Sequence, residues 1–264
     1  MLLLQGNKPM TLSELDSYFN SFLHRENFPG DPSRNGIQIQ NSAPDEKQIT
    51  KVAFAVDACT AAAEAAAAHG AQVLFVHHGL FWGDCSVITG VHYKRIAAFL
   101  KNDVALCAYH IPLDANEKVG NNAGLAERLG LRKVEPFGEW RGMNIGVKGV
   151  LSRPETLEEL AGRVMLPDEK PLAVLGFGVK EIRTVGIISG GAGEDVVQAA
   201  AAGLDAFITG AFEHEQYHYA EEAGINVLAG GHYQTETVGV NLVRAKLEKE
   251  KHIATVFIDI PTGL

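Results

Sequence analysis

VAFAVDACTAAAEAAAAHGAQVLFV, residues 52–76, consists of an apolar run, an alanine-rich stretch and a second apolar run, with Gly70 before the last of them. β-Branched and other apolar residues in short runs favour strands. Alanine is the strongest helix former, and glycine is the residue that most often ends a helix. The segment therefore predicts a strand, a helix and a second strand in succession.

The same pattern recurs later in the chain. VGIISGGAGEDVVQAAAAGLDAFIT, residues 185–209, aligns with the first copy without a gap at an offset of 185 − 52 = 133, and Gly203 takes the place of Gly70. A repeated β-α-β unit is typical of an α/β protein whose halves are structurally alike. The sequence thus predicts an α/β fold of two similar domains that arise from an internal repeat, each a sheet flanked by helices.

The segments around the two copies suggest how the domains are divided. ATVFIDI, residues 254–260, reads as a closing strand that returns to the first copy. We therefore expect a discontinuous first domain, residues 1–130 with 231–264, and a second domain, residues 131–230. Further expected elements are a capped helix with Thr11 and Glu14 at capping-box spacing, strands at 144–151 and 172–178, and helices from about 156 and at 237–251.

Composition limits the function classes. A net charge of −9 argues against nucleic-acid binding, and 46% apolar residues are enough for a sizeable core. The N-terminal leucines are too few for a signal-peptide core, and no apolar stretch reaches membrane-spanning length, so a cytoplasmic protein is expected. Cys59, Cys85 and Cys107 lack the spacing of a disulfide framework or a thiolate zinc site.

A second repeated feature consists of residues that can ligate a metal ion. VALCAYHIPLD (104–114) and NVLAGGHYQTE (226–236) each contain an apolar run, a histidine and, four positions later, a carboxylate. The two matches share one offset, since 232 − 110 = 236 − 114 = 122. His110 and Asp114 therefore correspond to His232 and Glu236.

A histidine pair, His77 and His78, ends another apolar run and is followed by Gly79. Open α/β sheets bind ligands at the carboxyl ends of their parallel strands, which is where all the chosen residues are expected. We expect Gly79 to let the backbone turn, so that the two adjacent side chains need not diverge. The predicted metal ligands, expected to meet at one seam, are His77, His78, His110, Asp114, His232 and Glu236.

Four imidazoles and two carboxylates are too many ligands for one ion but suffice for two divalent transition-metal ions, such as Zn, Fe, Mn, Co or Ni. HEQYH, residues 214–218, offers an alternative. It fits the H-E-x-x-H pattern of single-zinc peptidases, with Glu215 as base and Glu236 as a third ligand. That alternative gives no role to His77, His78 and His110.

The motifs NGIQIQ (35–40), VHHGLFW (76–82), HIPLDAN (110–116) and GHYQTE (231–236) together resemble the NIF-three-like dinuclear metal family, whose members are named GTP cyclohydrolase I type 2 homologues. The resemblance spans nearly the whole chain. It implies that two metal ions are bound by His77, His78, His110, Asp114, His232 and Glu236. It also implies two similar α/β domains and a toroidal homohexamer.

These observations favour a metal-dependent hydrolase in which an ion-bound water attacks the substrate. The family name suggests ring opening of GTP, hence a small-molecule, nucleotide substrate. His214 or His218 would then serve as the catalytic proton donor. The alternative is a non-catalytic metal-binding or regulatory scaffold protein, which ligand composition alone does not distinguish from an enzyme.

Overall fold

The computed structural model describes residues 9–84 and 86–264, and this part of the chain folds as two compact units. Unit 1 holds the residues up to Pro112 together with Val240–Ile260. Unit 2 holds Leu113–Gly239 together with Pro261–Leu264. Cys85 and the N-terminal leucines lie outside the described residues.

Unit 1 is built on a five-stranded sheet in the order β1-β4-β3-β2-β11. Strands β11, β2, β3 and β4 run parallel, and β1 is antiparallel to β4. Pairing of β11 with β2 confirms that the last strand returns to the first β-α-β copy. The strands are β1 (Gly36–Ile39), β2 (Lys51–Asp57), β3 (Val73–His78), β4 (Ala105–Ala108) and β11 (Ala254–Phe257).

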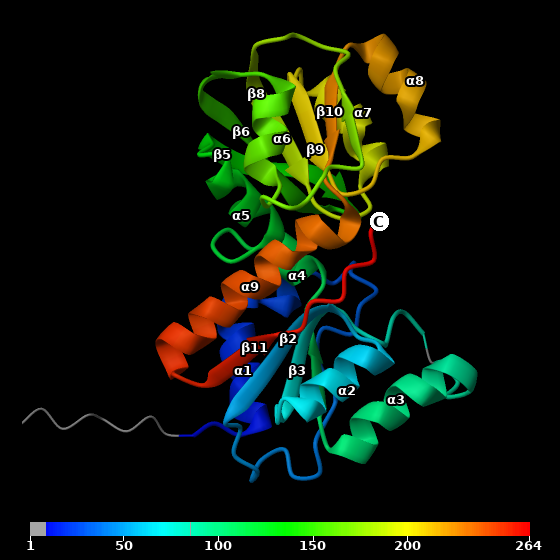
Figure 1. Cartoon of the computed structure of the whole chain (residues 1–264), viewed down its shortest axis with the longest axis vertical. Coiled ribbons are helices and arrows are strands. Elements are labelled where there is room, and N and C mark those ends of the chain that lie inside the picture. The colour runs from blue at the N-terminus through cyan, green and yellow to red at the C-terminus, as the bar shows by residue number, and fades with distance from the viewer. Residues whose placement is uncertain (1–8, 85) are drawn as a thin grey trace, which may run out of the picture. The chain divides into compact units, whose positions relative to one another are not determined.

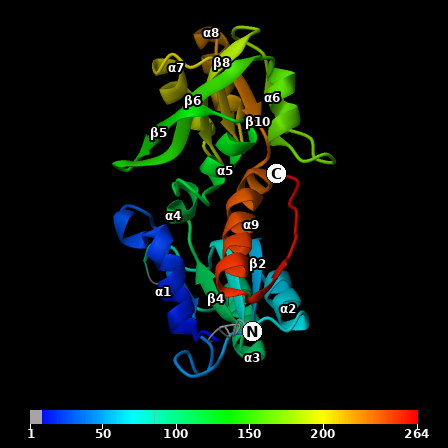
Figure 2. The same ribbon diagram turned by 90° about the vertical axis from the view of Figure 1, so that its left-hand side faces the viewer.

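Helices cover both faces of this sheet (Figures 1 and 2). Phe19 of α1 packs against Phe75 of β3, with ring centroids 4.8 Å apart, whereas Ala63 of α2 packs in one buried cluster with Leu74 on the opposite side of that strand. The capping box predicted for α1 is present, because Thr11 Oγ1 accepts the Glu14 N–H at 3.3 Å. The helical elements are α1 (Leu12–Leu23), η1 (Arg25–Asn27), α2 (Thr60–Ala68) and α3 (Gly90–Asn102).

Unit 2 contains a six-stranded sheet in the order β5-β6-β8-β9-β10-β7. Strands β8, β9 and β10 are parallel, and the remaining strands are antiparallel to their neighbours. The strands are β5 (Arg132–Trp140), β6 (Met143–Glu155), β7 (Ala173–Leu175), β8 (Ile182–Ile188), β9 (Ala206–Thr209) and β10 (Asn226–Ala229).

The strand registers reproduce the sequence repeat. Val52 lies opposite Val73 in the first copy, and Val185 lies opposite Ala206 in the second. Both residues of the pair are displaced by the same interval, since 185 − 52 = 206 − 73 = 133. An antiparallel strand, β1 or β7, also flanks the third parallel strand of each copy. These features confirm two similar α/β halves.

The helices of unit 2 are α5 (Asn121–Arg128), α6 (Leu157–Val164), α7 (Val196–Ala201), α8 (His214–Ala223) and the short η2 (Gly193–Asp195). The division between the units falls within two further helices, α4 (Ile111–Asp114) and α9 (His232–Lys251). No helix in residues 9–84 and 86–264 is both long enough and apolar enough to cross a membrane.

Several predicted elements have different bounds in the structure: β6 extends beyond 144–151, β11 covers only the first part of 254–260, and two others differ for a physical reason. The strand expected at 172–178 is only β7, because the Gly178 N–H donates to the Asn226 side chain at 3.0 Å instead of to a neighbouring strand. The helix expected at 237–251 begins earlier, at His232. Its first turn therefore carries the second histidine and carboxylate of the repeat.

Candidate metal centre

Three of the predicted ligands cluster within unit 1. His77 and His78 are the last residues of β3, and His110 follows β4 in the adjacent parallel position. The His77 ring centroid lies 4.5 Å from that of His78 and 5.1 Å from that of His110. One ring nitrogen of each lies within 4.8 Å of the others, so that the three could hold a metal ion.

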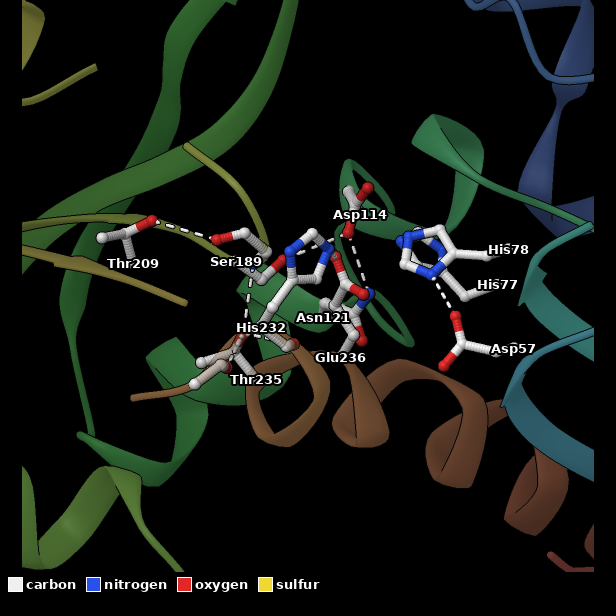
Figure 3. Close-up of polar contacts among 12 residues, drawn as sticks. Asp57, His77, His78, Asp114, Asn121, Ser189, Thr209, His232, Thr235 and Glu236 are labelled. Atoms are coloured by element: carbon white, nitrogen blue, oxygen red, sulfur yellow. Dashed lines mark hydrogen bonds and ion pairs between the residues drawn. The ribbon is translucent and has the colours of Figure 1, made fainter. Parts of the chain in front are cut away.

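Each of these imidazoles is oriented by an oxygen atom at Nδ1. Tyr109 O lies 3.1 Å from His77 Nδ1, Asp57 Oδ1 lies 2.8 Å from His78 Nδ1 (Figure 3), and Asp31 Oδ1 lies 2.9 Å from His110 Nδ1. A carbonyl or ionised carboxylate oxygen only accepts, so Nδ1 carries the proton in each ring. In a neutral imidazole this leaves the lone pair on Nε2, the usual arrangement of a metal-ligating histidine.

Gly79 has a different role from the one expected. Its φ lies outside the positive range, so the backbone needs no glycine-only turn there. A Cβ at this position would lie 2.3 Å from Gln38 Oε1, which accepts the Leu80 N–H at 2.7 Å. Glycine therefore leaves room for the Gln38 side-chain amide, which any larger residue would displace from this position.

The Asp31 carboxylate is held ionised within unit 1. Burial by itself would raise its pKa, but hydrogen bonds with His110, Asn35 and the Ser33 backbone, together with attraction to His110, hold the pKa below the ordinary value for aspartate. A negative charge beside His110 makes that imidazole a better electron-pair donor.

The other three predicted ligands belong to unit 2. Asp114 ends α4, and His232 and Glu236 lie one turn apart at the start of α9. His232 Nε2 is 3.2 Å from Glu236 Oε1, and carboxylate oxygens of Asp114 and Glu236 lie within 4.8 Å of each other. Both carboxylates are buried. Unit 2 thus gathers one imidazole and two acidic groups.

Buried amides fix Asp114 in place. Asn121 Nδ2 donates to Asp114 Oδ1 at 2.8 Å, and Ser189 Oγ donates to the same oxygen at 3.1 Å (Figure 3). Asn122 donates to the Asp114 carbonyl and accepts the Ser189 N–H at 2.7 Å. These contacts link the end of α4 to α5 and to the end of β8.

Glycines leave room around His232 and Glu236. A Cβ at Gly190 would lie 2.1 Å from Glu236 Oε1 and 3.2 Å from His232 Nε2. A Cβ at Gly210 would lie 2.8 Å from His232 Cα. The glycines after β8 and β9 therefore leave the His232 and Glu236 side chains the positions that they occupy here.

His214 and His218 lie elsewhere in unit 2, on α8. Both are exposed, and the His218 side chain, 72% accessible, has its Nδ1 3.5 Å from Glu221 Oε2. Their ring centroids are 6.4 Å apart. Among the described residues, neither belongs to a group of three or more side chains that could share an ion, so no zinc cluster forms at the H-E-x-x-H segment.

The donor chemistry fits a divalent transition metal. Imidazole nitrogens and carboxylate oxygens suit Zn, Fe, Mn, Co or Ni. Thiolates play no part among the described residues: Cys107 is buried in β4, where burial raises its thiol pKa, and Cys59 caps α2 through the Ala62 N–H.

Comparison with known proteins identifies the family. A family model described as Duf34/NIF3 (NGG1p interacting factor 3) matches residues 10–263. The chain belongs to the Duf34/NIF3 family. This confirms the family that the four sequence motifs predicted. It also agrees with the two-sheet α/β architecture described above.

Similar Duf34/NIF3 proteins match over nearly the whole chain. The GTP cyclohydrolase 1 type 2 homolog of Treponema pallidum is 45% identical over 289 aligned residues, covering 97% of this chain and 100% of that protein. The protein of the same name from Deinococcus radiodurans is 42% identical over 259 residues, covering 98% and 97%. The crystal structure of TTHA1606 from Thermus thermophilus is 38% identical, with a TM-score of 0.86, covering 97% of this chain and 100% of that one.

The sequence reasoning missed the residues that orient the ligands. Asp57 was detectable, because it ends the apolar run of β2 beside the predicted His78 position. Asp31 and Asn121 were harder to find, since nothing in their spacing links them to His110 or Asp114. Only NGIQIQ, the motif containing Asn35, pointed to that part of the chain.

Proposed function

We propose that the chain is a metal-dependent hydrolase that binds two divalent transition-metal ions. The observation that carries the proposal is the orientation of the three histidines of unit 1, whose Nδ1 atoms each face an oxygen acceptor and whose Nε2 atoms are thereby left as ligands. The proposed ligands are His77, His78, His110, Asp114, His232 and Glu236.

The number of donors supports two ions. One ion of this class is satisfied by four to six ligand atoms, and a hydrolytic ion keeps a position open for water. Four imidazoles with two carboxylates can supply three protein ligands to each of two ions. The two carboxylates would offset part of the positive charge, and the full burial of His77 would keep bulk water from competing for its nitrogen.

Bound divalent ions would supply Lewis acidity and lower the pKa of water. The chain itself must orient the substrate and handle protons. Relatives named GTP cyclohydrolase 1 type 2 homolog support a nucleotide, such as GTP, as the substrate class. We propose His214 and His218 as the proton donors, since both are exposed imidazoles on α8.

Metal content and turnover test the proposal. Purified protein loaded with Zn²⁺, Mn²⁺, Fe²⁺, Co²⁺ or Ni²⁺ should contain two ions per chain by elemental analysis and should convert GTP or a related nucleotide. Asp114→Ala should lower both the metal content and the turnover. His69→Gln is the matched control, because His69 is exposed at the end of α2 and should leave both unchanged.

Other outcomes separate the alternatives. Two bound ions without turnover across nucleotides, phosphoesters and peptides would favour a metal-binding or regulatory scaffold. One ion, with peptidase activity that survives His77→Ala and is lost in Glu215→Gln, would favour the single-zinc peptidase. Less than one tightly bound ion per chain, with every metal tried, would contradict the proposal outright.

We also propose that the protein assembles as a homohexamer. Support comes from the family resemblance alone. Sedimentation equilibrium of the metal-loaded protein should give a mass of about six chains, and a monomeric mass at micromolar concentration would contradict the assembly without affecting metal binding.

A further inference from the structure

Residues 31–38, DPSRNGIQ, contact both stretches of unit 1 from which the three clustered histidines come. We call them the clamp segment. Asp31 and Asn35 contact His110, and Gln38 contacts the backbone directly after His78 and Gly79. The segment includes most of the NGIQIQ motif, which the proposed ligand set leaves without a role.

Two side chains of the clamp segment hold both the ring and the backbone of His110. Asp31 accepts from His110 Nδ1 at 2.9 Å and, through its other oxygen, from the Ile111 N–H at 3.1 Å. Asn35 donates to Asp31 at 2.8 Å and accepts the His110 N–H at 2.8 Å. The position of His110 is thus tied to a closed set of hydrogen bonds.

The other end of the clamp segment holds the turn that follows the histidine pair. Gln38 Oε1 accepts the N–H groups of Leu80 at 2.7 Å and Phe81 at 3.1 Å. Main-chain bonds reinforce this contact, because the Arg34 N–H donates to Phe81 O at 3.0 Å. The clamp segment therefore fixes the backbone at both stretches that carry the clustered histidines: the turn after His78 and the residues at His110.

The Nδ1 partners of His78 and His110 differ in exposure. Asp57, the partner of His78, is 42% accessible, so water can replace its oxygen when the carboxylate is changed. The Asp31 side chain, the partner of His110, is 0% accessible, and water has no comparable access to its carboxylate. Loss of the buried partner should therefore disturb its histidine more than loss of the exposed partner.

We propose that Asp31 and Asn35 are positioning residues that hold His110 with Nε2 presented to a metal ion, and that metal affinity depends on Asp31 more than on Asp57. Removing a hydrogen-bond partner of a ligating histidine typically lowers metal affinity by about 10- to 100-fold. This inference rests on the proposed function, because it takes His110 to be a ligand.

The experiment compares Asp31→Asn, Asn35→Ala and Asp57→Asn with the wild type in the full chain. Affinity for Zn²⁺ is measured by competition with a chromogenic chelator. Asp31→Asn should weaken binding by about tenfold or more, Asn35→Ala should weaken it in the same direction, and Asp57→Asn should weaken it less than Asp31→Asn. Gln40→Ala, at an exposed position just beyond the segment, is the control and should leave the affinity unchanged.

Long-range ¹H–¹⁵N NMR spectra of the metal-free protein provide a second readout. They report which ring nitrogen carries the proton. In the wild type, His110 and His77 should both be protonated at Nδ1. In Asp31→Asn, His110 should lose this single tautomer while His77 keeps it, which a general loss of stability would not produce.

His110→Ala separates failure of the inference from failure of the proposed function. Unchanged Zn²⁺ affinity in His110→Ala would remove His110 from the ligand set and with it the proposed function as stated. A loss in His110→Ala, with wild-type affinity and an unaltered His110 tautomer in Asp31→Asn and Asn35→Ala, would overturn the clamp alone. If circular dichroism shows that Asp31→Asn does not fold, the Zn²⁺ affinity and the His110 tautomer of Asn35→Ala, which changes no charge, decide whether the clamp segment positions His110.

Discussion

At the scale of single residues, a comparison of Gly190 with Gly203 distinguishes the cost of backbone strain from the effect of crowding a proposed ligand. It has a φ of +71°, and a Cβ there would lie 2.1 Å from Glu236 Oε1. Gly203 has a φ of +66°, but a Cβ there would meet nothing within 4 Å. The two positions share the left-handed backbone conformation but differ in what a methyl group would contact.

We therefore expect Gly190→Ala and Gly203→Ala to cost a similar free energy of unfolding, about 1–2 kcal/mol, from the positive φ. The Glu236 carboxylate can swing aside, so crowding adds little to the folding cost but displaces a ligand. Only Gly190→Ala should lose metal affinity. Chemical denaturation and chelator competition measure the two effects, and equal affinities in both variants would argue against Glu236 as a ligand.

Cys107 allows a separate test of burial in unit 1. Its side chain is fully buried, and burial raises its thiol pKa, so little reactive thiolate is present in the folded protein. Alkylation by iodoacetamide, followed by peptide mass spectrometry, should modify Cys107 only when the protein unfolds, whereas the partly exposed Cys59 should react sooner. Rapid modification of Cys107 without denaturant would contradict this packing of β4.

Residue types and spacing were enough to choose six ligand candidates, because each is a polar group that follows an apolar run. Spacing did not reveal what holds them. Asp31 and His110 are 79 residues apart, and tertiary contacts such as the pairing of β1 with β4 bring that part of the chain alongside. Gly79 was expected to allow a turn, but its φ is not positive, and this glycine instead leaves room for the Gln38 side chain.

At the scale of elements, the β-α-β units were predictable because both periodicity and composition change sharply within 25 residues. β5 was not predicted, since RKVEPFGEW mixes charges with Pro136 and is mostly exposed. The start of α9 was also missed, because the Gly230–Gly231 pair before it looks like the beginning of a longer loop. The proposed ligands His232 and Glu236 consequently lie one helical turn apart, on α9.

Helix α9 also contains a glycine that its packing requires. A Cβ at Gly239 would lie 2.6 Å from Asn121 Oδ1 and 3.0 Å from the Asn121 backbone nitrogen. The Gly239 N–H donates to the same Asn121 oxygen at 2.7 Å, while the Asn121 amide donates to Asp114. Replacement of this glycine should therefore disturb Asp114 as well as the helix.

We expect Gly239→Ala to lower the free energy of unfolding by about 1–3 kcal/mol, the usual cost of overpacking. Gly162→Ala provides the matched control, because Gly162 lies within α6 and a Cβ there meets nothing within 4 Å. That change should stabilise the protein by up to about 1 kcal/mol from helix propensity. Urea unfolding measures whether the free energy of unfolding falls in Gly239→Ala and rises in Gly162→Ala. A stabilising Gly239→Ala would show that Asn121 does not pack against α9.

At the scale of the whole molecule, the chain passes between the two units after Pro112, after Gly239 and after Ile260. The predicted ligands divide equally, with three histidines in unit 1 and Asp114, His232 and Glu236 in unit 2. If all six bind ions, as we propose, then metal binding is coupled to the folded state of both units. Metal removal should then affect the stability of the entire chain.

A ligand present at 100 times its dissociation constant stabilises the folded state by about 2.7 kcal/mol. Two such ions would contribute about 5.4 kcal/mol. For a chain of this size, each kcal/mol corresponds to roughly 2–4 °C in Tm, so chelation should lower the Tm of the loaded wild type by about 10–20 °C. Differential scanning calorimetry with and without EDTA measures the shift. His69→Gln should keep it, whereas His77→Ala and Glu236→Ala should each lose most of it, because each removes a ligand from a different unit. If His77→Ala abolished the shift and Glu236→Ala retained it in full, the ions would depend on unit 1 alone, and the six-ligand proposal would have to be reduced to the three histidines.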